Sequence, residues 1–223
     1  SEAQYERRSE WNARGSSFQV VPDPFDEDAE IDWTPYWSLS EQRHKYLPTV
    51  FSYYSYPSQA NQFFSWAESN GSAAGNTLEE AILQGFFELV ERDAVAIWWY
   101  NRVRRPGVDL DSFKEPYCAE LRERYRRLNR DLWVIDITSD LGIPTFAAVS
   151  RRTDKPVEDI QFAFGSHFDP RIAMLRALTE LNQFLPFVRK RDEEGNTLYQ
   201  VDDAATLEWC KTRTCASEPW ILP

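Results

Sequence analysis

The sequence contains few of the residues on which several common classes of protein depend. Its 223 residues include three cysteines, two histidines and one methionine. The odd number of cysteines, without the spacing of a zinc site, favours a reduced, cytoplasmic setting over a secreted protein with disulfides. The longest unbroken apolar run, Ala94 to Tyr100, is far shorter than the ~20 residues that a membrane span requires. We therefore expect no membrane partner.

Several familiar catalytic motifs are also missing. The sequence contains neither G-x-x-x-x-G-K-[ST] nor G-x-G-x-x-G, so it supports neither a P-loop nor a Rossmann cofactor site. No serine or cysteine has the context of a nucleophile elbow, and a hydrolase triad is therefore unsupported. Acidic residues outnumber basic ones 36 to 25. This balance argues against a nucleic-acid partner, because affinity for phosphate depends on clustered Lys and Arg.

Aromatic residues are abundant, with 9 Trp, 10 Tyr and 14 Phe. This content favours a well-buried globule over a disordered chain. Residues 1–32 differ, because they hold nine acidic residues, three arginines and prolines at positions 22 and 24. We expect an irregular acidic segment over 1–32 and a folded part over 33–223.

Hydrophobic periodicity predicts an α+β fold, with an antiparallel sheet packed against amphipathic helices. Only six residues separate the strands at 132–138 and 145–152. Such a short connection requires an antiparallel hairpin. The other expected strands are 46–56, 62–66 and 160–164; the expected helices are 77–101, 116–128, 169–189 and 204–213; and 69–77 is an expected loop.

The helix at 77–101 carries acidic residues along one arc. Thr77 and Glu80 form the pattern of a capping box at its start. Glu88 and Glu91 are i, i+3 neighbours that repel unless a cation lies between them, and carboxylates are ligands that Mg²⁺ prefers. The polar arc comprises Glu80, Gln84, Glu88 and Glu91 with Arg92 at its edge, opposite the apolar Ile82, Phe86, Val90 and Ile97.

A solvated helix face explains the same pattern without any ligand. In that alternative Glu80 is only a capping residue, and Glu88 pairs with Arg92 at i, i+4 as on many surfaces. Trp98 lies close in angle to Glu80 and Glu91, and an indole is unusual on a face that only meets solvent. Trp98 therefore counts against a purely solvated face.

The helix at 169–189 repeats the arrangement. Arg176, Glu180 and Gln183 share one face, and an ordinary amphipathic helix explains this face as well. His167 just before the helix is expected to be a loop or capping residue. The arginines at 122–130 are expected on a solvated face, with the alternative of a patch for an acidic peptide. The apolar face comprises Met174, Leu178, Leu181 and Leu185.

Three stretches of the sequence resemble the YcaO-domain family. Residues 69–102 are SNGSAAGNTLEEAILQGFFELVERDAVAIWWYNR, and residues 164–183 are FGSHFDPRIAMLRALTELNQ. Residues 33–49, WTPYWSLSEQRHKYLPT, look most similar to the cyclodehydratases that make azoline-containing peptides, including the cyanobactin heterocyclases. The similarity extends from about Asp32 to the end of the chain.

The resemblance implies an ATP-dependent enzyme with Mg²⁺ and with glutamates and arginines in its nucleotide site. In such enzymes a Cys, Ser or Thr side chain of a precursor peptide attacks the preceding carbonyl, and phosphorylation by ATP lets the oxygen leave as a thiazoline or oxazoline forms. A fused or separate partner protein binds the leader of the peptide. By this resemblance Glu88 and Glu91 match the pair of residues that binds the metal. The residues that match nucleotide contacts of the family are Glu80, Arg92, Arg176, Glu180 and Gln183. By the same resemblance, Asn70 and Gly71 are expected to shape the wall of the site.

The chain also departs from the family. An earlier S-x-x-E-x-x-E-R helix that supplies further carboxylates is not found before Trp33, and the proline-rich tail of peptide cyclodehydratases is absent. We therefore expect a part of a YcaO-like domain that alone binds ATP weakly and is inactive. Thioamide or amidine formation, a non-catalytic peptide-binding or scaffolding module, and a carboxylate metal protein remain alternatives. The oligomeric state stays open, although exposed sheet edges would favour a homodimer.

Overall fold

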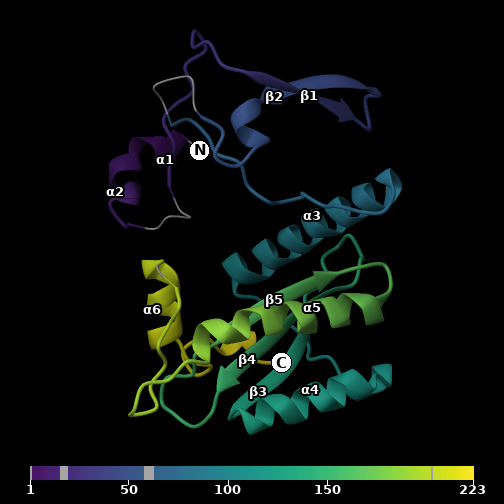
Figure 1. The fold of residues 1–223 in the computed structure, drawn as a ribbon, viewed down its shortest axis with the longest axis vertical. Helices are drawn as coiled ribbons and strands as arrows, with labels where there is room; N and C mark the ends of the chain where they lie inside the picture. The colour runs from purple at the N-terminus through teal and green to yellow at the C-terminus, as the bar shows by residue number, and fades with distance from the viewer. Residues whose placement is uncertain (1, 16–19, 58–62, 202) are drawn as a thin grey trace. The chain divides into compact units, whose positions relative to one another are not determined.

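The computed structural model describes residues 2–15, 20–57, 63–201 and 203–223 (Figure 1). They belong to two compact units, residues 1–69 and 70–223, which we describe separately. Across the described residues, no helix has both the length and the apolar character needed to cross a membrane. The division at residue 69 lies beyond the acidic segment, whose boundary at residue 32 stays a prediction.

The first unit begins with two short helices, α1 (Glu2–Glu6) and α2 (Arg8–Asn12). The sequence pattern did not predict them within the acidic segment. The side chain of Asn12 accepts a hydrogen bond from the Val21 N–H at 2.8 Å and donates to the Val21 carbonyl at 3.0 Å. These bonds link the end of α2 to the irregular chain that follows.

A two-stranded antiparallel hairpin follows, made of β1 (Trp33–Ser38) and β2 (Arg43–Pro48). The predicted strand at 46–56 is right only for its first three residues, because a 3₁₀ turn occupies Thr49–Phe51. Pro48 ends the pairing, since proline has no N–H to donate to a ladder. Of the predicted strand at 62–66, residue 62 lies outside the described residues and the remainder is irregular.

The second unit is built on a three-stranded antiparallel sheet in the order β3–β4–β5. Its strands are β3 (Arg130–Asp136), β4 (Thr145–Arg152) and β5 (Gln161–Ser166). This arrangement confirms the predicted α+β class and the predicted hairpin. Ala148 of β4 pairs with Val134 on one side and with Ala163 on the other.

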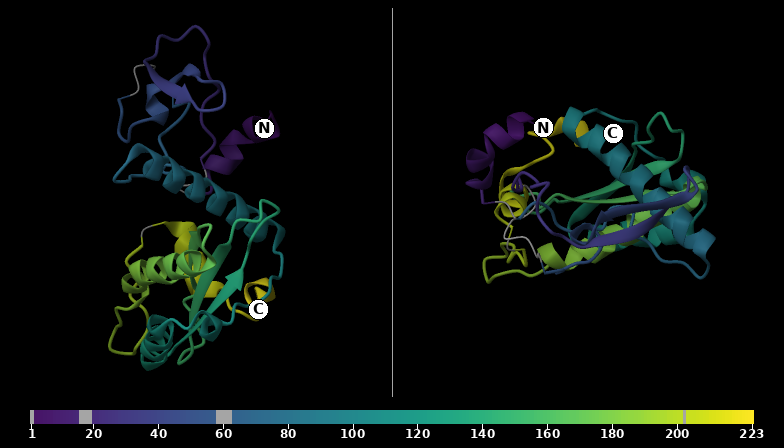
Figure 2. Two further views of the ribbon diagram at one scale, coloured as in Figure 1. Left: turned by 90° about the vertical axis from the view of Figure 1, so that its right-hand side faces the viewer. Right: turned by 90° about the horizontal axis from the view of Figure 1, so that it is seen from above.

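Helices cover both faces of this sheet. On one face α4 (Pro116–Arg127) contacts β3, and α5 (Pro170–Phe184) packs along β4 and β5 (Figure 1). On the other face lie α3 (Leu78–Asn101) and the C-terminal residues (Figure 2). Their side chains pack against the opposite side chains of the same strands. The two buried clusters include Leu121, Tyr125, Val134, Ala148, Met174 and Leu178 on the first face, and Ala94, Trp98, Ile135, Val149, Trp220 and Ile221 on the second.

The helix boundaries agree closely with the sequence patterns. Helix α3 starts after Thr77, whose side-chain oxygen accepts a hydrogen bond from the Glu80 N–H at 3.2 Å. Asp169 caps α5 in the same way by accepting from the Arg171 N–H at 2.8 Å. Helix α5 ends at Phe184, and a 3₁₀ turn, η3 (Leu185–Val188), occupies the rest of the predicted range. The predicted last helix is α6 (Ala204–Thr212).

The predicted apolar face of α3 is largely wrong. Ile82, Phe86 and Ile97 are 39%, 42% and 45% exposed, whereas Val90 is buried. The face that packs on the sheet includes Ala94 and Trp98, which follow Phe87 and Glu91 at helical spacing. Trp98 is buried, which agrees with its use as an argument against a purely solvated face. Periodicity located the helix, but it did not identify which of two mixed faces meets the sheet.

Arg130 also departs from the expected solvated arginine face. It is 3% exposed and opens strand β3. Its guanidinium donates to the side-chain oxygen of Ser150 at 2.8 Å and to the Asp159 carbonyl at 2.7 Å. Arg130 is thus a structural residue of the sheet, whereas Arg126 and Arg127 on α4 are exposed as predicted.

Candidate functional site

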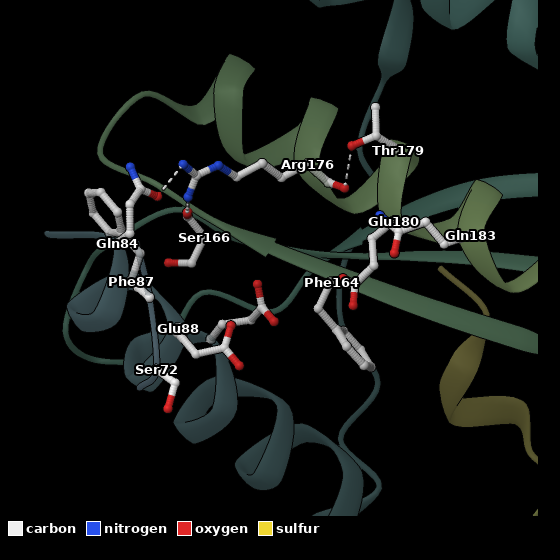
Figure 3. Close-up of a pocket in the computed structure, with 12 residues that line it drawn as sticks. Ser72, Gln84, Phe87, Glu88, Phe164, Ser166, Arg176, Thr179, Glu180 and Gln183 are labelled. Atoms are coloured by element: carbon white, nitrogen blue, oxygen red, sulfur yellow. Dashed lines mark hydrogen bonds between the residues drawn. The ribbon is translucent and has the colours of Figure 1, made fainter. Parts of the chain in front are cut away.

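A cavity of about 330 Å³ lies between α3, α5 and the edge strand β5 (Figure 3). Two residues of the loop before α3 complete its wall. This position brings together six of the residues that the sequence singled out, three on each helix, because the polar faces of α3 and α5 both meet the cavity. The lining residues are Ser72, Ala73, Gln84, Phe87, Glu88, Glu91, Phe164, Ser166, Arg176, Thr179, Glu180 and Gln183.

Two glycines allow the walls of the cavity to approach each other closely. A Cβ atom at Gly165 of β5 would lie 2.3 Å from the Ala173 carbonyl oxygen, so α5 rests directly on the strand backbone. A Cβ atom at Gly85 of α3 would lie 2.7 Å from the Gly71 carbonyl oxygen, so the loop before α3 rests on the helix. Any larger residue at either position would displace backbone. Gly71 therefore packs against α3 without lining the cavity, whereas Ser72 and Ala73 line it.

Glu88 and Glu180 each have one oxygen held by the protein. Arg92 donates twice to Oε1 of Glu88, at 2.9 and 2.8 Å. The N–H of Phe164, on the open edge of β5, donates to Oε2 of Glu180 at 2.9 Å. Within the described residues the second oxygen of each carboxylate accepts no hydrogen bond. Both side chains are therefore fixed in place with one oxygen left for a ligand.

Glu91 is the most deeply buried carboxylate of the site, with 8% of the residue exposed. Burial, and then the charge of Glu180, raise the pKa of Glu91 from 4.5 to about 8. Arg92 lowers the pKa of Glu91 by less than burial or Glu180 raises it; its guanidinium is 3.9 Å from Glu91 Oε1 and donates to Glu88 instead. Burial likewise raises the pKa of Glu180. Carboxylates that are costly to ionise together form a site that gains from a bound cation.

Arg176 supplies the positive charge on the opposite wall. Its guanidinium donates to the Ser166 carbonyl at 3.1 Å and to the side-chain oxygen of Gln84 (Figure 3). It also lies 5.8 Å from the ring centre of Phe87. No carboxylate pairs with Arg176 among the ion pairs of the described residues. The guanidinium is therefore held at the cavity while its charge remains available for an anion.

These donors fit Mg²⁺ and phosphate. In the part of the chain that the structure describes, no three acidic, histidine or cysteine side chains converge as a ready-made metal cage. Mg²⁺ does not require such a cage, since it is usually bound by one or two carboxylates together with substrate phosphates. Glu88 and Glu91 would hold the cation, and Arg176 would face the phosphate. This assignment uses the free oxygen of Glu88, the buried carboxylate of Glu91 and the guanidinium of Arg176.

Two predicted nucleotide contacts lie outside the cavity lining. The carboxylate of Glu80 accepts from the Asn76 N–H at 2.8 Å and from the Asn76 side chain at 3.1 Å, at the start of α3. Among the described residues, the side chain of Arg92 pairs with Glu88 and Glu91 of the site. Their nucleotide roles stay predictions. His167 is a loop residue, as expected, and its Nδ1 accepts from the Asp169 N–H at 2.9 Å.

Sequence reasoning missed several lining residues. Ser166 contributes through its backbone carbonyl, which no side-chain motif reveals. Thr179 and Phe164 line the cavity because of where α5 crosses the edge of β5. Thr179 follows Arg176 by three positions on the same helix, so helical spacing could have identified it. Phe164 required knowledge of the strand register.

The comparison with known families is decisive. A family model described as a YcaO cyclodehydratase that binds ATP and Mg²⁺ matches residues 2–219. The chain belongs to the YcaO family. A YcaO protein of Methanopyrus kandleri, solved with AMPPCP and Mg²⁺ bound, is 27% identical with a TM-score of 0.58 over 74% of this chain and 43% of its own.

Two solved heterocyclases are more similar to this YcaO chain. One, in complex with substrate and cofactor, is 51% identical with a TM-score of 0.89 and covers 100% of this chain. The heterocyclase TruD is 49% identical with a TM-score of 0.80 over 99% of it. An uncharacterised protein of Methanothermobacter thermautotrophicus is 31% identical over 74% of the chain. The chain spans only 29% and 30% of the two heterocyclases and 43% of the archaeal protein.

Proposed function

We propose that this chain provides part of the ATP and Mg²⁺ site of an enzyme that cyclodehydrates Cys, Ser or Thr residues of a ribosomal precursor peptide to thiazoline or oxazoline. The observation that carries this proposal is the convergence of Glu88, Glu91 and Glu180 on one cavity opposite the unpaired Arg176. Similarity to a heterocyclase solved with substrate and cofactor supports the choice of reaction within the family.

The residues of this chain would act by position and charge. ATP supplies the phosphoryl group that makes an amide oxygen a leaving group, and Mg²⁺ neutralises the phosphates. Arg92 orients Glu88 so that one oxygen faces the cavity. The edge of β5 orients Glu180 in the same way. Preorganised charges of this kind stabilise developing phosphoryl-transfer charge without first having to rearrange.

The partners follow from the reaction. A precursor peptide with a leader is the substrate, and a fused or separate protein presents that leader. The microcin synthetase of Escherichia coli, solved with its pro-peptide bound, has the same fold at 14% identity over 69% of this chain. It supports the fold of the domain alone. Association into a homodimer stays a prediction.

The test replaces Glu88 and Glu91 individually by Gln in the full-length protein that carries this chain. We expect each variant to lose at least about 10²-fold in azoline formation from a cognate peptide and ATP, followed as loss of water by mass spectrometry. Glu79→Gln on the exposed first turn of α3 is the matched control and should retain activity. Wild-type rates in both site variants would contradict the proposal and would favour a non-catalytic peptide-binding module.

A further inference from the structure

A second concave surface lies on the other side of α5 from the cavity. It is a groove of about 860 Å³ between α4, the C-terminal end of α5 and η3. The two helices lie side by side on the same face of the sheet (Figure 1). The groove shares no lining residue with the cavity, and the proposed chemistry makes no use of it. Its volume is in the range of sites that bind ligands.

Arginines outnumber glutamates three to two in the lining of this groove, although the whole chain has a net charge of −11. Arg124 and Arg127 of α4 and Arg189 after η3 line it. Arg127 pairs with Glu123 at 2.8 Å. Neither Arg124 nor Arg189 forms a side-chain hydrogen bond or ion pair with any described residue. Two guanidinium groups therefore line the groove without an ion-pair partner among the described residues.

The floor of the groove combines apolar and hydrogen-bonding groups. Leu121 and Leu185 are buried beneath it. Asn182 accepts from the hydroxyl of the fully buried Tyr125 at 3.1 Å and donates to the hydroxyl of Tyr117 at 2.8 Å. This chain of bonds fixes the Asn182 amide. An ordered amide can form hydrogen bonds with a peptide backbone, and the apolar surface beside it can contact the side chains of the peptide.

We propose that this groove binds an acidic segment of the peptide substrate, with its carboxylates on Arg124 and Arg189. The guanidinium fork suits a carboxylate in bidentate geometry. The observations favour a peptide over a nucleic acid, because Glu120 and Glu123 also line the groove and would repel a continuous phosphate backbone. An isolated carboxylate on a peptide can reach the arginines without lying along those glutamates.

The position of the groove connects it to the reaction. Asn182 lines the groove and its neighbour Gln183 lines the cavity. The two surfaces are thus separated by the width of one helix, about 10 Å. An extended peptide crosses that width with three or four residues, at about 3.3 Å per residue. This inference rests on the proposed function only where it identifies the bound peptide as the substrate. Binding of an acidic peptide in the groove does not require the proposed function.

Fluorescence polarisation of a short labelled peptide that carries two separated Asp residues tests the groove directly. The 223-residue chain should bind it more tightly than a matched peptide with Asn in place of Asp, and added salt should weaken the binding. The double variant Arg124→Gln, Arg189→Gln should bind about tenfold more weakly. The double Lys variant should retain most of the affinity. Arg122→Gln removes the same charge from α4 outside the groove and should bind like wild type.

Four results would overturn the inference. The first two are equal binding of the Asp and Asn peptides and unchanged binding of the Asp peptide by the double Gln variant. The third is comparable binding of a single-stranded oligonucleotide. The fourth is a concentration-dependent dimer that the double Gln variant abolishes and Arg122→Gln does not, because the groove would then bind a second copy of the chain. The assay contains no ATP and forms no azoline. If the Glu88 and Glu91 variants kept full activity while the Asp peptide still bound, the proposed function alone would fail. If those variants lost activity while the Asp peptide failed to bind, the inference about the groove alone would fail.

Discussion

The buried carboxylate of Glu91 should make the stability of the chain depend on pH in a metal-free buffer. Its pKa is about 8 in the folded chain against 4.5 without the fold. Between these values the folded state holds a proton that the unfolded state releases. The stability contributed by this proton is therefore complete below about pH 4.5 and is lost as pH rises toward 8. Glu91→Gln cannot titrate and should lose this dependence.

The magnitude follows from the two pKa values. Each pH unit between them changes the free energy of unfolding by up to about 1.4 kcal/mol. Integration from pH 5.5 to 7.5, with the folded pKa at about 8, gives a loss of about 2.5 kcal/mol from Glu91. Glu91→Gln should thus gain about 2.5 kcal/mol relative to wild type across this interval. Other groups contribute equally to both proteins and cancel in the difference.

Urea unfolding followed by tryptophan fluorescence, with EDTA present, measures this difference at the two pH values. Glu79→Gln removes an exposed carboxylate from the same helix, and it should follow the wild-type pH dependence. If wild type and Glu91→Gln lost stability in parallel between pH 5.5 and 7.5, the carboxylate would be ionised in the folded chain. The description of the cavity as a site that lacks its cation would then be refuted.

Three further substitutions test the packing of the second unit by the same urea measurement. Gly165→Ala should cost about 3 kcal/mol, because its Cβ would lie 2.3 Å from backbone of α5; a loss below about 1 kcal/mol would contradict the close approach. Glu218→Gln should cost about 3 kcal/mol, since this 1% exposed carboxylate accepts from Arg102 at 2.7 Å and from Trp220 at 2.8 Å; unchanged stability would refute its pairing. Asp169→Ala should cost about 1 kcal/mol through loss of the α5 cap, and Asp169→Asn, which keeps the capping oxygen, should restore most of it.

Local signals predicted most elements of the second unit. The caps at Thr77 and Asp169 and the six residues between the two hairpin strands are short-range features, and they determined the starts of α3 and α5 and the pairing of β3 with β4. The first unit was less predictable. A residue there forms a strand only where a partner strand pairs with it, as β1 does with β2. The aromatic run after Pro48 has a high strand propensity but no partner strand among the described residues, so it does not continue β2.

The candidate site was predictable as residues but not as an arrangement. Helical spacing grouped Glu88 with Glu91, and Arg176 with Glu180, on separate helices. The approach of these helices depends on Gly165 and on the register of β5, which are long-range features. The same lack of tertiary information explains the error on α3. Its exposed Phe86 and buried Glu91 follow from the position of the sheet rather than from hydropathy.

The bond between Glu180 and β5 has a consequence for the sheet itself. An edge strand offers its free N–H groups to any passing strand, which is a route to aggregation. Glu180 occupies the Phe164 N–H of that edge with one oxygen and faces the cavity with the other. A foreign strand that paired at Phe164 would have to dislodge the carboxylate that faces the proposed ligand. Protection of the sheet edge and order in the cavity therefore depend on one side chain, and occupancy of the cavity would strengthen both.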